Sequence, residues 1–168
     1  QAEVLSLAIG QGAYDQSPLR MAQLYAALAA DGRVPAPRIA ATEVPYEREE
    51  WNLHLSESTL GAIREGLRRV TLPGAGTARL SALAHWDWRG KTGTSQNPHG
   101  KDHGWFTGIA GPKGGEAEIA VAVIIEAGEH GSTAAQYAAK IADYYLRRKY
   151  GMATDTIQTL REHLWTGR

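Results

Sequence analysis

An apolar run from Ile119 to Ile125 constrains the fold of this chain more than any other stretch. Its seven residues include no polar side chain, and Glu118 and Glu126 flank them. A short, β-branched run of this kind predicts a strand that is buried on both faces. A strand buried in this way needs helices on both sides of its sheet, so we expect layers of helix and sheet.

Two further strands are predicted upstream of this run. Residues 104–110 form one of them, and the short connection Lys113-Gly114-Gly115 joins it to the apolar run as a hairpin. The other strand carries Lys91, and the alternating Trp86 and Trp88 before it predict two rings on one face. The sequence thus predicts an antiparallel meander of about three strands, with the Lys91 strand first and at the edge.

Two helices are predicted in the first half of the chain. One begins with Ser17 as N-cap and Pro18 at the first helical position, and it stops at Gly32. The other begins at Ser56-Glu57 and has an apolar stripe opposite a charged face that we expect to be solvated. The stripe consists of Leu60, Ile63, Leu67 and Val70, and the charged face of Arg64, Glu65 and Arg68.

The remaining segments complete an α+β prediction. Residues 33–45 contain three prolines and predict an extended connection or edge strand, with a β-like part at 38–44. A third long helix is expected from Ser132-Thr133 to the basic Arg147-Arg148-Lys149, and a fourth at 154–165. The apolar positions of the third helix are Ala135, Ala138, Ala139, Ile141, Ala142 and Tyr145, and its alanines would allow close approach to a sheet.

Composition narrows the possible functions. The 168 residues fit one domain, and the 18 basic and 18 acidic side chains form no long run of one sign. This balance indicates neither nucleic-acid binding nor attraction to an anionic membrane surface. The chain has no cysteine, so disulfides and thiolate metal sites are excluded, and no apolar run has the length of a bilayer span. We expect a soluble segment without a cofactor.

The chemistry is concentrated in Gly90-Lys91-Thr92-Gly93-Thr94-Ser95. Two glycines allow a substrate or another backbone to lie close against the strand. The lysine ammonium attracts an anionic group, and the three hydroxyls can donate hydrogen bonds to a carboxylate. This combination suits a peptide that ends in a carboxylate, or a β-lactam.

Other polar residues are weaker candidates. His99 and His103 have a spacing that suits a metal, but no third ligand accompanies them in their glycine- and proline-containing loop. We therefore expect no metal, and we expect His103 to line a cleft or to form a hydrogen bond. Glu126 and Glu129 could form a carboxylate pair, although solvated loop acids are commoner.

Three blocks, in order, give the chain a family resemblance. They are Gly10-Gln11-Gly12 with 17–22 (Ser-Pro-Leu-Arg-Met-Ala), the Lys-Thr-Gly strand 90–96, and 103–108 (His-Gly-Trp-Phe-Thr-Gly). Lys-Thr-Gly is one of three short signatures of penicillin-binding proteins and serine β-lactamases. The whole order resembles the C-terminal part of the transpeptidase domain of class B penicillin-binding proteins, most like the cell-elongation type, penicillin-binding protein 2.

The resemblance implies a function and a site. It implies the penicillin-binding fold and D,D-transpeptidation, in which serine acyl transfer cross-links peptidoglycan stem peptides at the periplasmic face of the bacterial inner membrane. The implied catalytic residues are Lys91 and Thr94, the latter through its backbone N–H as an oxyanion donor, and Thr92, Gly93, Thr94 and Ser95 would bind substrate. The implied partners are stem peptides ending in D-Ala-D-Ala, β-lactam antibiotics and the cell-elongation machinery.

The chain departs from the family pattern in one important respect. Acyl transfer needs a hydroxyl beside a base, and the family's Ser-x-x-Lys is absent from these 168 residues. Ser17-Pro18-Leu19-Arg20 has arginine in place of the base, and Ser95-Gln96-Asn97 imitates the Ser-x-Asn motif on the wrong strand. We therefore expect residues 1–168 to be the C-terminal portion of one transpeptidase domain, with both motifs upstream of Gln1, and to be inactive alone. A catalytically inactive binding module of cell-wall assembly, or a β-lactamase or D,D-carboxypeptidase relative, remain the alternatives.

Overall fold

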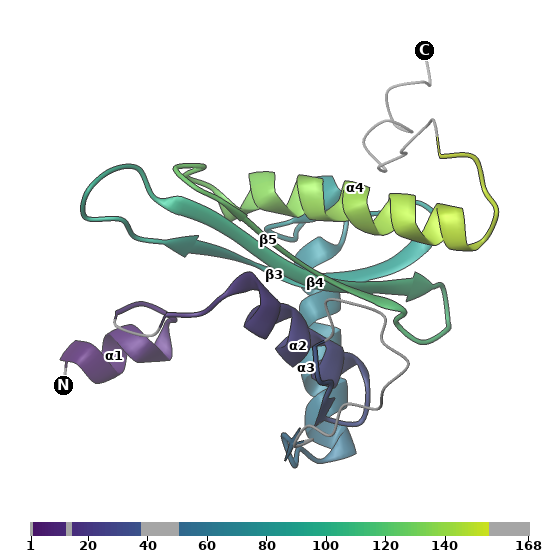
Figure 1. Ribbon diagram of the computed structural model, residues 1–168, viewed down its shortest axis with the longest axis horizontal. Helices are drawn as coiled ribbons and strands as arrows, with labels where there is room; N and C mark the ends of the chain where they lie inside the picture. The colour runs from purple at the N-terminus through teal and green to yellow at the C-terminus, as the bar shows by residue number, and fades with distance from the viewer. Residues whose placement is uncertain (1, 13–14, 38–50, 155–168) are drawn as a thin grey trace.

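The computed structural model describes residues 2–12, 15–37 and 51–154, and an antiparallel sheet lies at its centre (Figure 1). The sheet consists of β3 (Trp86–Ser95), β4 (His103–Pro112) and β5 (Ile119–Ile125), in the order β3-β4-β5. This confirms the predicted meander and the place of the Lys91 strand at its edge. Pairing of β3 with β4 runs from Trp86↔Pro112 to Ser95↔His103, and Gly114 supplies the positive φ of 77° in the next hairpin.

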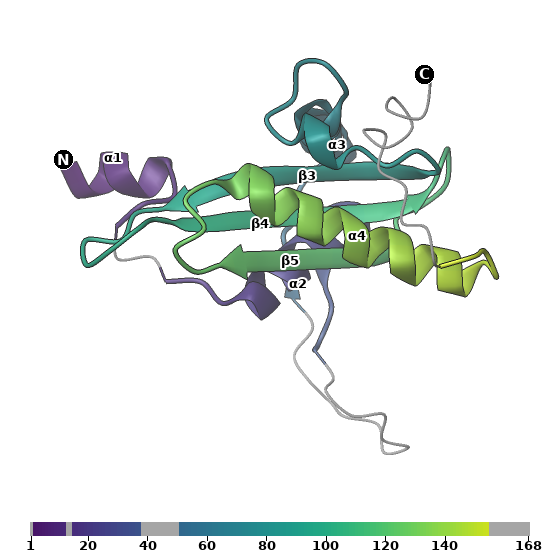
Figure 2. The same cartoon turned by 90° about the horizontal axis from the view of Figure 1, so that it is seen from above.

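Helix α4 (Gly131–Lys149) covers one face of the sheet (Figure 2). Five of its side chains are fully buried alanines, which let the helix backbone approach the strands closely: Ala134, Ala135, Ala138, Ala139 and Ala142. They pack with Trp86, Trp88 and Phe106, so the predicted core role of the two tryptophans is confirmed. Ile141 and Tyr145 were predicted on the same face, but both are exposed on the outer side of α4.

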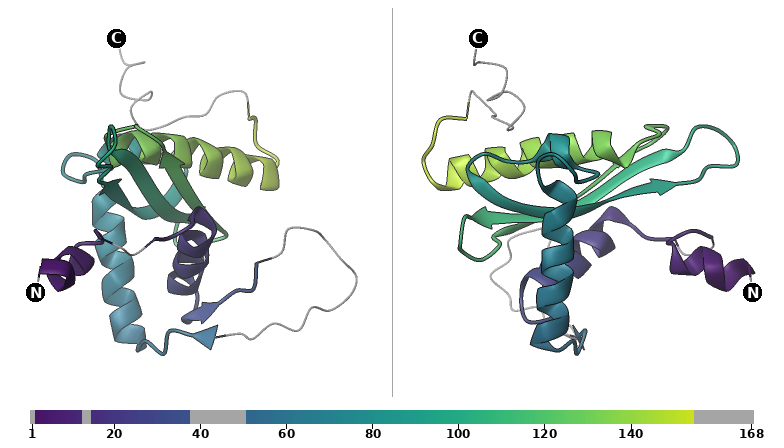
Figure 3. Two further views of the ribbon diagram at one scale, coloured as in Figure 1. Left: turned by 60° about the vertical axis from the view of Figure 1, so that its left-hand side comes forward. Right: turned by 180° about the vertical axis from the view of Figure 1, so that it is seen from behind.

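Helices α2 (Pro18–Ala29) and α3 (Glu57–Thr71) lie on the opposite face of the sheet (Figure 3). Both begin as predicted, because Ser17 accepts a hydrogen bond from the backbone N–H of Arg20, and Ser56 accepts one from that of Thr59. Their apolar residues form a second cluster with Ile109 of β4. The sheet is therefore a middle layer between helices, as the apolar run required.

Two further predictions about burial were wrong. The residues of β5 are only partly buried except Val121, because among the described residues no strand pairs with the outer edge of β5. On α3, the Arg64 side chain is not simply solvated: its Nε donates to the Leu28 carbonyl at 2.7 Å, and Nη1 lies 3.0 Å from Glu57. A long guanidinium side chain can cap the end of a neighbouring helix, and the charge pattern of one helix does not reveal this.

The shorter elements connect these layers. They are α1 (Ala2–Ala8), the paired strands β1 (Arg33–Val34) and β2 (Trp51–Asn52), and the single turn η1 (Arg79–Ser81). The predicted strand-like segment 38–44 lies outside the described residues, and so does nearly all of the predicted helix 154–165. No helix within the described ranges is both long and apolar enough to cross a bilayer.

Candidate active site

The candidate site is the second half of β3, where the strand is open on one side. Its inner edge pairs with β4, and no strand among the described residues pairs with its outer edge. Side chains donate to three carbonyls of this outer edge, those of Trp88, Thr92 and Thr94; the donors are Thr71, Lys91 of β3 itself, and Gln11. All three are even-numbered residues, and the backbone groups of every second residue in a strand point to the same side. The N–H and carbonyl of Thr94 therefore point away from β4. The strand thus presents backbone acceptors and donors to any ligand that lies along it.

Lys91 is exposed, and its ammonium lies at this open edge. Nζ donates to the Thr92 carbonyl at 2.8 Å, so the side chain curls along its own strand instead of entering the core. No carboxylate is paired with Lys91 in the described structure, although the described Lys101 and Lys149 each have a glutamate partner. The positive charge is therefore available to an anionic ligand.

The hydroxyl residues are placed differently from one another. Thr92 Oγ1 lies 3.0 Å from Thr77 Oγ1, which belongs to the loop between α3 and η1. Thr94 is exposed, and its carbonyl accepts from Gln11 Nε2 at 2.9 Å. Ser95 is half-buried at the end of the strand, opposite His103. All the predicted site residues, Lys91 to Ser95, thus lie next to one another at the end of β3.

The two glycines of the motif make room for protein atoms. A β-carbon on Gly90 would lie 2.2 Å from the Phe106 ring, so this glycine admits the core aromatic. A β-carbon on Gly93 would lie 3.3 Å from the Trp105 side chain of β4, so the close neighbours of both motif glycines are atoms of the paired strand. The Gly93 carbonyl oxygen also lies close to α4, because a β-carbon on Gly131 would be 2.4 Å from it.

This contact places the start of α4 directly against the motif. A β-carbon on Gly104 would likewise lie 2.7 Å from the His130 carbonyl oxygen, so two further glycines allow this approach. The N-terminus of a helix carries a partial positive charge from its aligned peptide dipoles. The first turn of α4 therefore adds positive potential behind Gly93, while the Lys91 ammonium adds it at the open edge.

The other polar candidates have structural partners. His103 Nδ1 accepts from the Ala127 backbone N–H at 3.0 Å, in line with the predicted hydrogen-bonding role. Glu129 pairs with Lys101 at 3.2 Å instead of with Glu126. The Asp102 carboxylate accepts from the Asn97 backbone N–H at 3.1 Å and shapes the loop after β3. Within the described part of the chain, no group of three or more acidic or histidine side chains could hold a metal ion.

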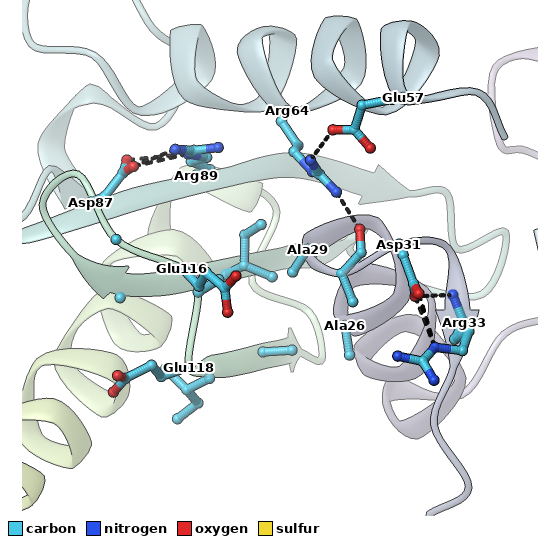
Figure 4. A pocket seen from close by; sticks show the side chains of 17 residues that line it. Ala26, Ala29, Asp31, Arg33, Glu57, Arg64, Asp87, Arg89, Glu116 and Glu118 are labelled. Atoms are coloured by element: carbon cyan, nitrogen blue, oxygen red, sulfur yellow. Dashed lines mark hydrogen bonds and ion pairs between the residues drawn. The ribbon is translucent and has the colours of Figure 1, made fainter.

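A cavity of about 640 Å³ lies elsewhere, between α2, α3 and the first residues of β3 and β5 (Figure 4). Six of its charged side chains form ion pairs, namely Asp31 with Arg33, Glu57 with Arg64, and Asp87 with Arg89. The other two are carboxylates, Glu116 and Glu118, so the described residues that line the cavity offer no free cation. Lys91, Thr92 and Thr94 do not line it. We place the chemistry at the strand edge, because there the cation and the backbone groups are available to a ligand.

Sequence reasoning missed two residues of the site, Gln11 and Thr77. Both touch β3 from positions far away in the chain, 83 residues for Gln11 and Thr94, and 15 for Thr77 and Thr92. Gln11 stands between two glycines that form a turn, with φ of 75° at Gly10 and 95° at Gly12. The paired glycines were the available signal, since glycines readily adopt the left-handed backbone of a tight turn, and such a turn brings the residue between them to the sheet edge.

Comparison with known proteins identifies the relatives of this arrangement. The family described as penicillin binding protein transpeptidase domain matches residues 1–146. The peptidoglycan D,D-transpeptidase MrdA of Acinetobacter baumannii is 32% identical over 169 residues, a match that covers 87% of this chain and 25% of that protein. The chain therefore spans about a quarter of the length of this curated relative.

Solved structures agree with the sequence match. The structure of Pseudomonas aeruginosa PBP2 in complex with WCK 5153 superimposes with a TM-score of 0.76 at 32% identity, over 91% of this chain and 36% of that one. The complex between PBP2 and MreC from Helicobacter pylori gives 0.73 at 25% identity, over 89% of this chain and 28% of that one. The likeness includes most of this chain and a minor part of each relative.

Proposed function

Because this chain belongs to the penicillin-binding protein transpeptidase domain family, we propose that it forms the Lys-Thr-Gly side of a peptidoglycan D,D-transpeptidase active site. In the proposed reaction, a serine hydroxyl attacks the carbonyl of the penultimate D-Ala of a stem peptide, and the terminal D-Ala leaves. An amine of a neighbouring stem peptide then takes the acyl group and releases the serine. Residues 1–168 would be the C-terminal portion of the domain, and the serine would come from a segment outside them.

The observation that carries this proposal is the open edge of β3 with the exposed Lys91 ammonium upon it. A stem peptide ends in a carboxylate, which the ammonium attracts and the hydroxyls of Thr92 and Thr94 can bind. The backbone N–H of Thr94 lies on the same edge and is the proposed oxyanion donor. A donor fixed in a strand needs no reorganisation as charge develops, and one such donor contributes about 100-fold or more to the rate of acyl transfer.

The serines of this chain do not supply a nucleophile with its base. No Ser-x-x-Lys occurs in the sequence, and in its nearest counterpart Ser17 is the N-cap of α2, with Arg20 at the position of the base. Arginine keeps its proton at accessible pH, so it cannot accept one from a serine. We therefore expect the 168-residue chain to form no acyl-enzyme by itself.

Labelling with a fluorescent penicillin tests this proposal. The 168-residue chain should give no covalent adduct, whereas a polypeptide from the same reading frame, extended upstream to include a Ser-x-x-Lys, should be labelled. In the extended polypeptide, Lys91→Ala should slow acylation by about 100-fold or more without lowering the melting temperature. Lys140→Ala is the matched control, because Lys140 is exposed on α4 away from the site.

Two outcomes would contradict the proposal. A stable adduct on the 168-residue chain would show that it contains its own nucleophile. Acylation that stays near the wild-type rate in Lys91→Ala would remove the role of this residue. If the extended reading frame contains no Ser-x-x-Lys and the chain still binds D-Ala-D-Ala peptides, the alternative function is supported, a catalytically inactive module that uses the same edge.

Partners and location follow from the same proposal. The Helicobacter pylori relative is known in a complex with MreC, and we propose that the parent of this chain likewise works with the cell-elongation machinery. Its substrates would be stem peptides, its inhibitors β-lactams, and its place the periplasmic face of the inner membrane. Protease accessibility in spheroplasts would test the location, since a periplasmic domain is digested when only the outer membrane is opened.

A further inference from the structure

The Gly10-Gln11-Gly12 turn brings one carboxamide onto the open edge of β3. Gln11 Nε2 donates to the Thr94 carbonyl at 2.9 Å, and Gln11 Oε1 accepts from the Gln96 backbone N–H at 3.4 Å. One side chain thus occupies an acceptor and a donor two residues apart, one near the end of β3 and the other directly after it. A neighbouring strand would use the same two backbone groups.

These two groups belong to the edge that a peptide would use. A peptide that binds by strand addition obtains its affinity from main-chain hydrogen bonds to an exposed sheet edge. Three outward carbonyls of β3 accept from a side chain, those of Trp88, Thr92 and Thr94, and the first is already held by the buried hydroxyl of Thr71. Of these three, only the Thr92 and Thr94 carbonyls accept solvent-exposed hydrogen bonds, which a ligand can displace.

We propose that Gln11 is a specificity-determining residue, which competes with bound peptide for the Thr94 carbonyl. A ligand that offers an amide N–H to this carbonyl must displace Gln11 and then replaces the bond that Gln11 made. A ligand without that N–H either leaves Gln11 in place or breaks the hydrogen bond between Gln11 and the Thr94 carbonyl without replacing it. The competition rests on the proposed function, because it concerns the same ligand-binding edge.

The surroundings of Gln11 allow it to move. Both of its hydrogen bonds are solvent-exposed, and a β-carbon built on Gly10 meets no atom within 4 Å. In the preceding α1 the apolar side chains are exposed, with 68% for Val4 and 70% for Leu5, so α1 does not pin the turn to the sheet. Displacing Gln11 therefore breaks two exposed hydrogen bonds and little packing.

The experiment uses the ¹⁵N-labelled 168-residue chain, Gln11→Ala, and the control Gln136→Ala. Gln136 lies on α4, and its Nε2 donates only to the Ser132 carbonyl of its own helix. The probes are an N-acyl D-Ala-D-Ala peptide and the same peptide with methylated amide nitrogens. In Gln11→Ala, amide exchange at Gln96 should be about fivefold faster, and the first peptide should bind about fivefold more tightly, which corresponds to one exposed hydrogen bond.

The methylated peptide should bind equally to all three proteins, and Gln136→Ala should behave as wild type with both peptides. Unchanged exchange at Gln96 in Gln11→Ala would show that the bridging contact is not formed. Peptide-induced shifts at Thr94 and Gln96 with equal or weaker affinity in Gln11→Ala would overturn the competition alone. If the peptide shifts no resonance along β3 in any of the three proteins, the proposed function fails and the competition fails with it.

Discussion

The two halves of strand β3 differ in how their groups are held. In the first half, Trp86 and Trp88 are buried, and their indole N–H groups donate to Asp143 at 2.7 Å and to Ser81 at 3.1 Å. In the second half, Lys91 and Thr94 are exposed, and the backbone edge accepts solvent-exposed hydrogen bonds from Lys91 and Gln11. One continuous strand is therefore buried scaffold at one end and the proposed binding edge at the other, so the proposed site is built on a rigid element.

The scaffold half depends on a buried ion pair. Asp143 accepts from Trp86 and also from Arg147 Nε at 2.8 Å, with side chains that are 1% and 7% exposed. Removal of one partner leaves the other charge buried without compensation. Asp143→Ala should therefore lower the free energy of unfolding by about 3–5 kcal/mol, measured by urea denaturation.

The control for Asp143→Ala is an ion pair on β3 itself. Asp87 also pairs with an arginine, Arg89, but both side chains are partly exposed. Asp87→Ala should cost about 1 kcal/mol or less, because solvent screens and replaces the interaction. Equal losses in the two variants would show that the first half of β3 is not anchored by its buried pair.

The second half of β3 is supported from behind by the glycine contact with α4. In Gly131→Ala the new methyl group would lie 2.4 Å from the Gly93 carbonyl oxygen and 2.6 Å from that of Trp105. Such overpacking costs about 1–3 kcal/mol, and the motif strand has to shift. Urea denaturation, together with amide chemical shifts at 91–95, would measure both effects.

Replacing a glycine that has open surroundings should have the opposite effect on stability to Gly131→Ala. Gly61 lies inside α3, and a β-carbon built there meets nothing within 4 Å. Gly61→Ala should therefore stabilise the fold by about 0.5–1 kcal/mol, since alanine loses less backbone entropy in a helix. A Gly131→Ala variant that gains stability in the same way would refute the close contact between α4 and the motif.

The outer edge of the scaffold half is fixed by one hydroxyl. Thr71 is buried, and its Oγ1 donates to the carbonyls of Trp88 and Arg68. Thr71→Val keeps the shape but leaves the Trp88 carbonyl without this donor, which should cost about 1–2 kcal/mol in thermal or urea unfolding. Thr133→Val, at an exposed position of α4, should stay within about 0.5 kcal/mol.

Low pH should change the stability of the fold least, because the carboxylate that it protonates, Glu65, lies on the solvent side of α3. Hydrogen bonds from Arg68 and Arg69 lower the pKa of Glu65 from its ordinary 4.5 to about 2. A carboxylate whose pKa is lowered by folding contributes its full stabilisation when the pH is above its pKa in the unfolded chain. This contribution is lost as the pH falls from 4.5 towards 2. An NMR titration of the Glu65 side chain would check the pKa, and Glu65→Gln should abolish this part of the pH dependence while leaving ligand binding unchanged.

Local patterns were sufficient for most of the fold and for one wall of the site. Ser17 and Ser56 start helices because their hydroxyls cap the first turn, and Trp86 and Trp88 are buried because alternate residues of a strand share a face. The order of the three strands followed from short connections. Lys91 stands on an edge strand as predicted, and the family that its motif suggested matches residues 1–146.

The parts that could not be predicted depend on long-range contacts. Gln11 reaches Thr94 only after the sheet and the turn have both formed, and Arg64 caps α2 only because two helices meet. The burial of β5 was overestimated for a related reason, since composition reports the apolarity of a strand but not the number of its neighbours. The role of Lys91 itself stays a prediction until acylation is measured.

The unpaired outer edge of β5 has a consequence for the solubility of this chain. A seven-residue ribbon without charge or proline, open along one side among the described residues, is the kind of template on which copies of a protein stack into fibrils. Self-association should therefore rise steeply with concentration, and a lysine introduced at Ala122 would be a simple gatekeeper against it.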